Sequence, residues 1–243
     1  MQSPNDDWPA VDCTVSAERY QRVESPGDVE AAATALACAQ FPGVDRCVTA
    51  SLEAMLKALT PSFSEVEFRG EPGGHQDGAN RGFLRSDSLV AVLFVEGVDD
   101  CSLADLRHLE RGAPPCSDSR ICCEERLLPV ERYLDGLHRL GARRVVVNAI
   151  TGIPADAHPA PGDAEAIRAV LARPEMMAPT SPLCAIPGWT SVFPSPRLTR
   201  MVADCPGGVW SMCDPRLPTT PDGQRELMRE IGSSIARAAC HPE

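Results

Sequence analysis

The sequence lacks most of the patterns by which common enzymes and membrane proteins are recognised. Its 243 residues contain no apolar run of about 18 residues, so no transmembrane helix is expected. Gly-x-Ser-x-Gly, Gly-x-Gly-x-x-Gly and phosphate-loop patterns are also missing, which leaves serine hydrolases and nucleotide-binding proteins without support. Lysine and arginine number 23 against 34 acidic residues, and the net charge of −11 argues against nucleic acid as a partner.

The beginning of the chain has neither the basic region nor the apolar core of a signal peptide. Cysteine, in contrast, is abundant, with 11 residues. That number is typical of a compartment that permits disulfides, so we expect an exported protein: periplasmic, extracellular or on the cell surface. Together these features imply either a signal upstream of Met1 or a fragment. The odd count leaves at least one thiol unpaired or paired outside the chain.

One stretch organises the rest of the chain. Leu89 to Val95 (LVAVLFV) is an unbroken apolar run rich in β-branched residues, which predicts an inner strand of a parallel sheet covered on both faces. The run ends at an acidic loop, residues 96–100. Ligand sites of open α/β sheets lie at the carboxyl ends of strands, so this loop is the first candidate site. Its candidate binding residues are Glu96, Asp99 and Asp100, with Thr151 from the next strand.

Alternating strand and helix patterns predict an α/β fold with a Rossmann-like parallel sheet flanked by helices. Further strands are expected at 143–150 and 209–212, and a short exposed strand at Glu18–Val23. Helices are expected at 25–40, from Asp45 to about Leu59, at 102–110, 129–140, 163–173, 195–204 and 222–239. Residues 1–16 are expected to be a flexible leader and 17–243 one domain with disulfide-rich loops. Residues 61–82 and 174–194 are expected to be loops.

Other chemistry has weaker support. His75 and Asp77 lie in a glycine-rich loop, where a metal site competes with the simpler interpretation of a flexible loop. His108 and His138 fall on helices and are interpreted as ordinary helical histidines. Cys116, Cys122 and Cys123 lack paired Cys-x-x-Cys units, so a disulfide loop is favoured over zinc. No cofactor is expected.

Four segments in order carry a family resemblance: ACAQFPGVDRCVTASLEAMLKAL, GFLRSDSLVAVLFVEGVDDCS, LLPVERYLDGLHRLGARRVVVNAITGIP and PSPRLTRMVADCPGGVWSMCD. The chain resembles, from about residue 18 to 235, the C-terminal two-thirds of von Willebrand factor A-like domains in secreted or lipid-anchored proteins of myxobacteria. The family's central strand ends in Thr-Asp-Glu-Asp-Asp-Cys-Ser; here Glu96, Gly97 and Val98 depart from it and residues 99–102 match.

The departures predict a degenerate metal site. The family's Asp-x-Ser-x-Ser loop and first strands are missing, the position of its second-loop Thr falls near Val44 or Asp45, and Gly97 replaces its third ligand. A hard cation needs several oxygen ligands, so no metal is expected. The remnants Asp99 and Asp100 are interpreted as a solvated acidic loop or as helix caps. Without the first strand, the strand at 89–95 has one unpaired side, unless Glu18–Val23 or a loop covers it.

The cysteines are expected to form disulfides in three regions. Cys38 and Cys47 match the family's corner cysteines, and a turn between them would also bring their sulfurs together. Cys101 is a candidate to join the loop of Cys116, Cys122 and Cys123. A further disulfide is expected among Cys184, Cys205 and Cys213, with Cys13 or Cys240 left over.

These features lead to one functional expectation and two alternatives. The expectation is a non-enzymatic, exported binding or adhesion module whose partner is an unknown protein or surface ligand. The first alternative is a hydrolase that uses the acidic loop 96–100 with His75 or His108. The second is a decayed gene product without activity. A carboxylate and a histidine close together in a pocket would favour the hydrolase.

Overall fold

The computed structural model describes residues 49–68, 71–78, 80–85, 88–104, 126–140, 145–178, 180–186, 191–216 and 221–240. Several predictions fall outside these ranges. They are the leader 1–16, the strand at Glu18–Val23, the helix at 25–40, most of the helix at 102–110, His108, and Cys13, Cys38, Cys47, Cys116, Cys122 and Cys123.

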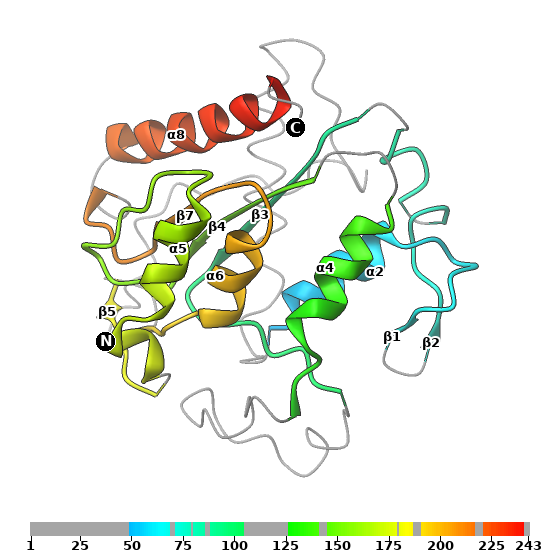
Figure 1. Cartoon of the computed structure of the whole chain (residues 1–243), viewed down its shortest axis with the longest axis horizontal. Coiled ribbons are helices and arrows are strands. Elements are labelled where there is room, and N and C mark those ends of the chain that lie inside the picture. The colour runs from blue at the N-terminus through cyan, green and yellow to red at the C-terminus, as the bar shows by residue number, and fades with distance from the viewer. Residues whose placement is uncertain are drawn as a thin grey trace, which may run out of the picture.

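A three-stranded parallel sheet forms the centre of the described structure (Figure 1). Its strands are β3 (Val90–Glu96), β4 (Val145–Thr151) and β7 (Val209–Ser211), in the order β3-β4-β7. The three predicted strands are therefore confirmed, as is the α/β class with helices on a parallel sheet. β3 and β4 pair along their whole length, from Val90 beside Val145 to Glu96 beside Thr151.

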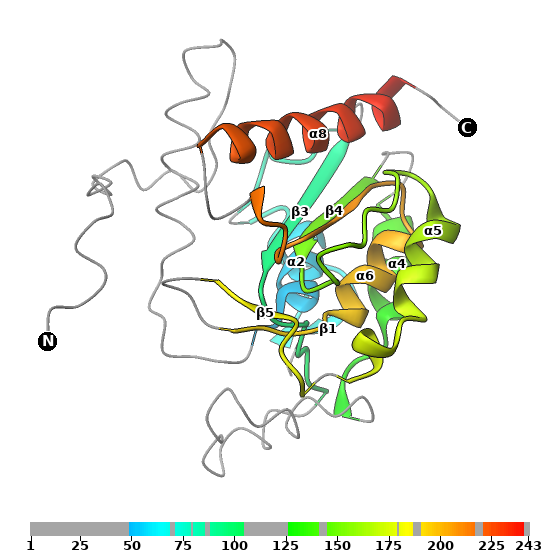
Figure 2. The ribbon, with the colours of Figure 1, turned by 90° about the vertical axis from the view of Figure 1, so that its left-hand side faces the viewer.

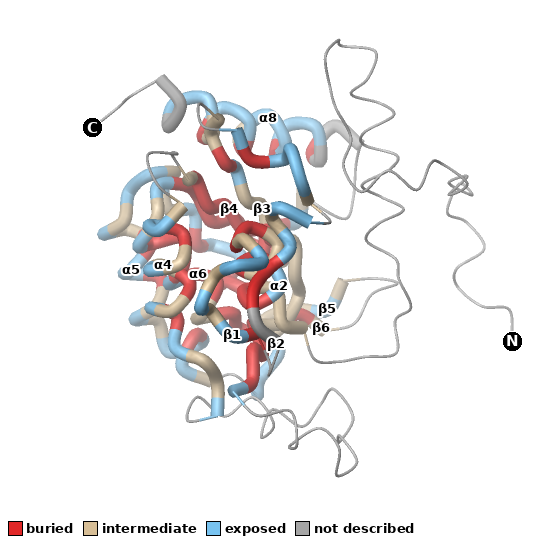
Figure 3. The backbone as a smooth tube through the Cα atoms, turned by 90° about the vertical axis from the view of Figure 1, so that its right-hand side faces the viewer, coloured by how far each residue is buried: buried red, intermediate tan, exposed pale blue. Residues whose placement is uncertain are grey.

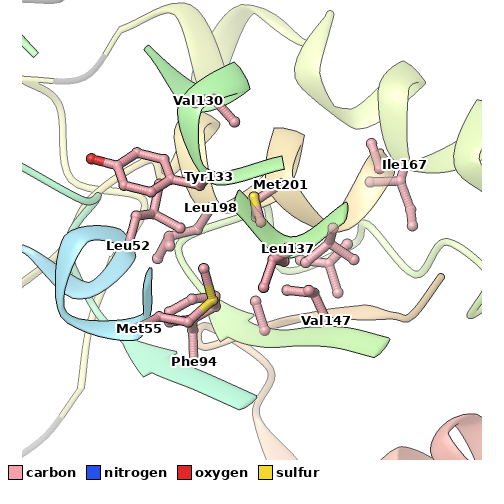
Figure 4. Packing of buried hydrophobic residues seen from close by; sticks show 14 of the residues in the cluster. Leu52, Met55, Phe94, Val130, Tyr133, Leu137, Val147, Ile167, Leu198 and Met201 are labelled. Atoms are coloured by element: carbon pink, nitrogen blue, oxygen red, sulfur yellow. The ribbon is translucent and has the colours of Figure 1, made fainter. Parts of the chain in front are cut away.

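Four helices cover one face of the sheet. They are α2 (Ser51–Leu59), α4 (Val130–His138), α5 (Ala164–Leu171) and α6 (Pro196–Ala203). Each buries an apolar stripe with helical spacing. Figure 4 shows Leu52 of α2, Tyr133 and Leu137 of α4 and Leu198 of α6 converging on one core. Phe94 and Val147 supply the sheet's contribution to that core.

The other face of the sheet carries α8 (Pro221–Cys240), which lies opposite α5 and α6 (Figure 2). Leu227 and Ile231 of α8 pack with Ile150 and Trp210, which belong to β4 and β7. Val192 belongs to the same cluster, and Leu93 and Val95 of β3 pack against it while remaining half-buried. None of the helices in the described ranges is long and apolar enough to cross a membrane.

β3 is less covered than its sequence predicts. Val90 and Phe94 are buried against the four helices, but Ala91 is exposed and the remaining four residues of the strand are half-buried. Figure 3 shows the contrast with β4, which is buried almost throughout. The apolar run thus identifies the strand correctly, while its coverage on both faces is true of β4 and not of the described surroundings of β3.

Two short hairpins occupy segments that were expected to be loops. β1 (Glu67–Phe68) pairs with β2 (Glu71–Pro72), and β5 (Cys184–Ala185) pairs with β6 (Ser191–Val192), both antiparallel. A 3-10 helix, η2, spans Pro174–Met177. Such short elements leave little periodic signal in a sequence, since two residues cannot show alternation.

Candidate functional site

The carboxyl edge of the sheet brings together the acidic residue and the threonine expected to bind a ligand. Glu96 and Thr151 are register partners on adjacent parallel strands, so their side chains leave the same face of the sheet. Ser51, the first residue of α2, donates a hydrogen bond from its hydroxyl to Oε1 of Glu96. The strand ends and the helix start are therefore fixed to each other at this point.

Two oxygens at this edge are buried without a partner. Within the described ranges, Oε2 of Glu96 and Oγ1 of Thr151 accept and donate no hydrogen bond, although Thr151 is fully buried. Burial raises the pKa of Glu96, and hydrogen bonds from the Ser51 and Thr49 hydroxyls oppose that rise. A buried polar atom without a partner costs free energy, so this pair of oxygens is a place where a donor group would be stabilised.

The carboxylate of Asp100 caps the start of α2 and pairs with Arg197. Its side chain is fully buried, and Oδ1 accepts hydrogen bonds from the N–H of Leu52 (2.9 Å) and the hydroxyl of Ser102 (2.8 Å). Oδ2 forms an ion pair with Nη2 of Arg197 at 3.1 Å. The Ser102 hydroxyl in turn accepts from the N–H of Glu53. Asp100 and Ser102 thus supply the acceptors that the first turn of α2 lacks in its own sequence.

Asp99 performs the same task for α6. Its two carboxylate oxygens accept the N–H groups of Arg197 (3.0 Å) and Leu198 (3.2 Å). Burial raises the pKa of Asp99 to about 7, against the lowering effect of these two hydrogen bonds. Ser195, which stands at the N-cap position of α6, makes no side-chain cap hydrogen bond, and its hydroxyl donates to the carbonyl of Phe193 at 3.3 Å. Of the two interpretations of this acidic pair, the geometry supports helix caps.

The turn after Thr151 is built by close backbone approach. A Cβ on Gly152 would lie 1.7 Å from the carbonyl oxygen of Phe193, so only glycine fits. The N–H of Ser195 donates to the Gly152 carbonyl at 2.8 Å, which joins this turn to the start of α6. Thr151 is therefore held rigidly, with its hydroxyl beside Glu96 at the end of the neighbouring strand.

His75 does not join the acidic loop. Its backbone N–H donates to the carbonyl of Lys57, near the end of α2, whereas Glu96 contacts Ser51 at the helix start. Six residues of helix separate the two positions by about 9 Å along the axis. Asp77 accepts hydrogen bonds from the backbone and hydroxyl of Ser62. In the described part of the chain no three His, Cys, Asp or Glu side chains gather in a way that would hold a metal ion.

A second feature, which the sequence did not reveal, is a cleft of about 750 Å³ between the loop after β4 and the middle of α8. Its polar lining includes His158, Asp214, Arg216 and Glu230, with Trp210 on one wall. Arg216 bridges Asp214 (2.7 Å) and Glu230 (3.1 Å), and the Trp210 indole N–H donates to Glu230. Burial favours the neutral acid at Asp214, but the hydrogen bonds from Arg216 outweigh it and lower the pKa. The charges of this cleft are thus largely satisfied among themselves.

One expected disulfide is present with its pairing resolved. Cys184 of β5 is bonded to Cys213, just after β7, with an S–S distance of 2.10 Å and a Cα–Cα distance of 5.9 Å. Cys205, the third candidate of that group, is a free, half-buried thiol, and burial raises its pKa to about 11. Cys101 is also disulfide-bonded, as expected.

Comparisons with protein-family models, curated proteins and solved structures found no match. The fold and the geometry of this edge are therefore the basis of the functional interpretation that follows.

Proposed function

We propose that this chain is a non-enzymatic, metal-independent binding module of an exported protein, and that it binds a donor-bearing side chain of a partner protein at Glu96 and Thr151. The observation that carries the proposal is the pair of buried oxygens without a partner on adjacent strands. A lysine, arginine or amide N–H placed there would satisfy both. The carboxylate group of Glu96 and the net negative charge of the whole chain favour a cationic donor.

The same geometry supports binding over hydrolysis. Asp99 and Asp100, which a hydrolase or a cation site would use, hold the first turns of α6 and α2. His75 belongs to the far end of α2 and is not available as a general base for Glu96. General acid–base catalysis needs the two groups within hydrogen-bond reach, directly or through one water. The residues of the edge therefore suit recognition.

The von Willebrand A-like relationship and the export of the protein belong to this proposal. Three parallel strands, of which β3 is the first in the chain and is followed by the acidic loop, fit such a domain without its first strands. The Cys184–Cys213 disulfide fits an oxidising compartment. In this interpretation the acidic loop retains Asp99 and Asp100, which cap helices, while Gly97 occupies the position of a metal ligand.

Selection from displayed peptides tests the proposal. A random library of peptides about as long as β3 is panned on the full chain, and dissociation constants of the enriched peptides are measured by calorimetry with and without EDTA. We expect enrichment of lysine or arginine, no effect of EDTA, and binding at least ten times weaker for Glu96→Gln or Thr151→Val. Glu65→Gln, the same change at an exposed site, is the control and leaves binding unchanged. Unchanged binding in all three variants, loss of binding in EDTA, or no enrichment would overturn the proposal.

A further inference from the structure

The open edge of the sheet lies beside Glu96. β3 is the outer strand of the sheet among the described strands, and β4 is its one partner there. In the described part of the chain no further backbone hydrogen bond reaches residues 90–96, and the open edge ends at Gly97, whose C=O accepts from the N–H of Phe193 at 2.8 Å. The strand is seven residues long and apolar up to Glu96, and of its residues that face the α8 side Ala91 is exposed and Leu93 and Val95 are half-buried. A long, apolar outer strand is a template for pairing with another strand.

The register shows which backbone groups face outward. Val147 and Ala149 of β4 donate their N–H groups to Pro206 (2.9 Å) and Gly208 (3.0 Å), on the β7 side. Since successive residues of a strand direct their N–H and C=O groups to opposite sides, the intervening residues of β4 direct theirs to β3. In a parallel ladder these bond to alternate residues of the neighbouring strand, which by the observed register are Val90, Val92 and Phe94.

The other alternate residues of β3 are Ala91, Leu93 and Val95. Their N–H and C=O groups therefore point away from β4, toward the open edge. Their side chains lie on the α8 side of the sheet, where Ala91 is exposed and Leu93 and Val95 are half-buried. The edge thus combines outward backbone donors and acceptors with apolar side chains on the α8 side. The carboxylate of Glu96, with its unpartnered oxygen, lies at the end of the strand on the opposite face, beside Ser51 of α2.

We infer that the partner binds by strand addition: an extended segment of another protein pairs with the outer edge of β3 and places a lysine or arginine beside Glu96. This inference rests on the proposed function and names its partner class. Charge complementarity selects the occupant, because the residue of an added strand next to Glu96 would share the face of its carboxylate, and the chain carries a net charge of −11. A second copy of this chain would bring the sequence VAVLFVE and the same negative charge, so it lacks the required cation.

The mode of binding has a direct chemical signature. Strand addition depends on the peptide's own backbone N–H groups, whereas a side chain docked on its own does not. Replacing a pairing N–H by N-methyl removes one hydrogen bond and introduces a clash at the edge. Loss of one such bond corresponds to a roughly three- to tenfold weaker complex, and the clash adds to it.

The experiment uses the full chain and the peptides enriched on it. Each peptide is resynthesised with one N-methyl group at successive positions, and amide exchange of the protein is measured with and without peptide. We expect binding to fall at least tenfold at alternate N-methyl positions. The N–H groups of Ala91, Leu93 and Val95 should gain protection on binding. Ala91→Pro removes one outward N–H and should weaken binding about three- to tenfold, while Ala91→Val, which keeps it, should not.

The experiment distinguishes a failure of strand addition from a failure of the proposed function. Binding that depends on Glu96 but tolerates N-methylation at every position overturns strand addition and leaves the proposed function standing. Loss of Glu96-dependent binding altogether overturns both. If the three amides are protected before any peptide is added, the edge is already occupied. Protection that rises with protein concentration identifies a second copy as the occupant, and protection independent of concentration identifies the chain's own residues. Either result overturns the inference. The N-methyl series does not depend on the folding of any variant.

Discussion

Asp99 and Asp100 are consecutive residues that begin two different helices. Asp100 accepts from the first turn of α2, which lies 48 positions earlier, and Asp99 accepts from the first turn of α6, which lies 98 positions later. Sequence reasoning looks for caps next to the helix start, and here the residues at the two N-cap positions, Ala50 and Ser195, make no side-chain cap hydrogen bond. From the sequence alone, helix capping is one of two interpretations of this loop, because the helices that Asp99 and Asp100 cap are brought to them only by the tertiary structure.

Loss of the Asp100 carboxylate is expected to be severely destabilising. Asp100→Ala leaves the largely buried Arg197 cation without its carboxylate partner and uncaps α2, so the free energy of unfolding should fall by about 3–5 kcal/mol. Urea denaturation followed by circular dichroism measures this change. Asp156→Ala breaks the exposed pair with Arg173 and serves as the matched control, with an expected loss below about 1 kcal/mol. Equal losses in the two variants would contradict the role given to Asp100.

Asp99 should make stability depend on pH in an unusual direction. Its pKa in the folded state is about 7, above the usual 3.8, so between these values the folded protein binds more protons than the unfolded chain. The stabilisation is therefore present below pH 3.8 and is lost as the pH rises toward 7.

Asp99→Asn keeps an oxygen for the helix start but cannot titrate. Across about pH 4.5 to 6.5, the stability of the wild type should fall more steeply than that of Asp99→Asn, by about 1.4 kcal/mol per pH unit. Chemical denaturation at several pH values gives both slopes. Parallel curves would show that Asp99 is not a proton-binding group of the folded state.

At the scale of elements, the long regular segments could be predicted from the sequence. The apolar runs 89–95 and 143–150 became β3 and β4, and the helical spacings gave α4, α5, α6 and α8 close to their expected bounds. The two-residue strands of both hairpins could not be predicted, since their pairing depends on tertiary contacts and on the Cys184–Cys213 bond. Five or more periodic residues give a signal that two cannot.

Replacing either of two glycines by alanine should change the stability of the protein in opposite directions. Gly152→Ala places a methyl group against the Phe193 carbonyl in the turn after β4, so it should lower stability by about 1–3 kcal/mol. Gly232 lies within α8 with nothing within 4 Å of its would-be Cβ. Gly232→Ala should therefore raise stability by about 0.5–1 kcal/mol through helix propensity. Thermal melts of both variants measure these two changes in stability. A Gly152→Ala variant more stable than the wild type would contradict the close backbone approach in this turn.

The Cys184–Cys213 disulfide should contribute substantially to stability. It closes a loop with a sequence separation of 29, for which the loss of unfolded-chain entropy corresponds to about 3.6 kcal/mol. We expect Cys184→Ala with Cys213→Ala to lower the free energy of unfolding by about 2–4 kcal/mol. The free thiol Cys205 is the control, and Cys205→Ala should cost about 1 kcal/mol or less. A double variant as stable as the wild type would show that the bond does not constrain the unfolded chain.

At the scale of the whole molecule, the sheet is covered unequally. One face is packed by four helices, the other by α8 over β4 and β7, and β3 has an open side in the described structure. Sequence placed Glu96, Asp99, Asp100 and Thr151 at one edge because parallel strands end together. The sequence could not show which of their oxygens accept hydrogen bonds from other described residues and which have no partner there. It also could not show the cleft at Trp210 and Arg216, because the hydrogen bonds and the cleft both depend on contacts between distant segments.

Residue-resolved amide exchange of the free chain tests the central claim, that β3 presents an open edge beside Glu96. We predict alternating protection along this one strand: slow exchange at Val92 and Phe94, whose N–H groups face β4, and fast exchange at Ala91, Leu93 and Val95. Val147 and Ala149, bonded toward β7, provide slow references on the neighbouring strand. Uniformly slow exchange from Ala91 to Val95 in the monomeric chain would contradict the account.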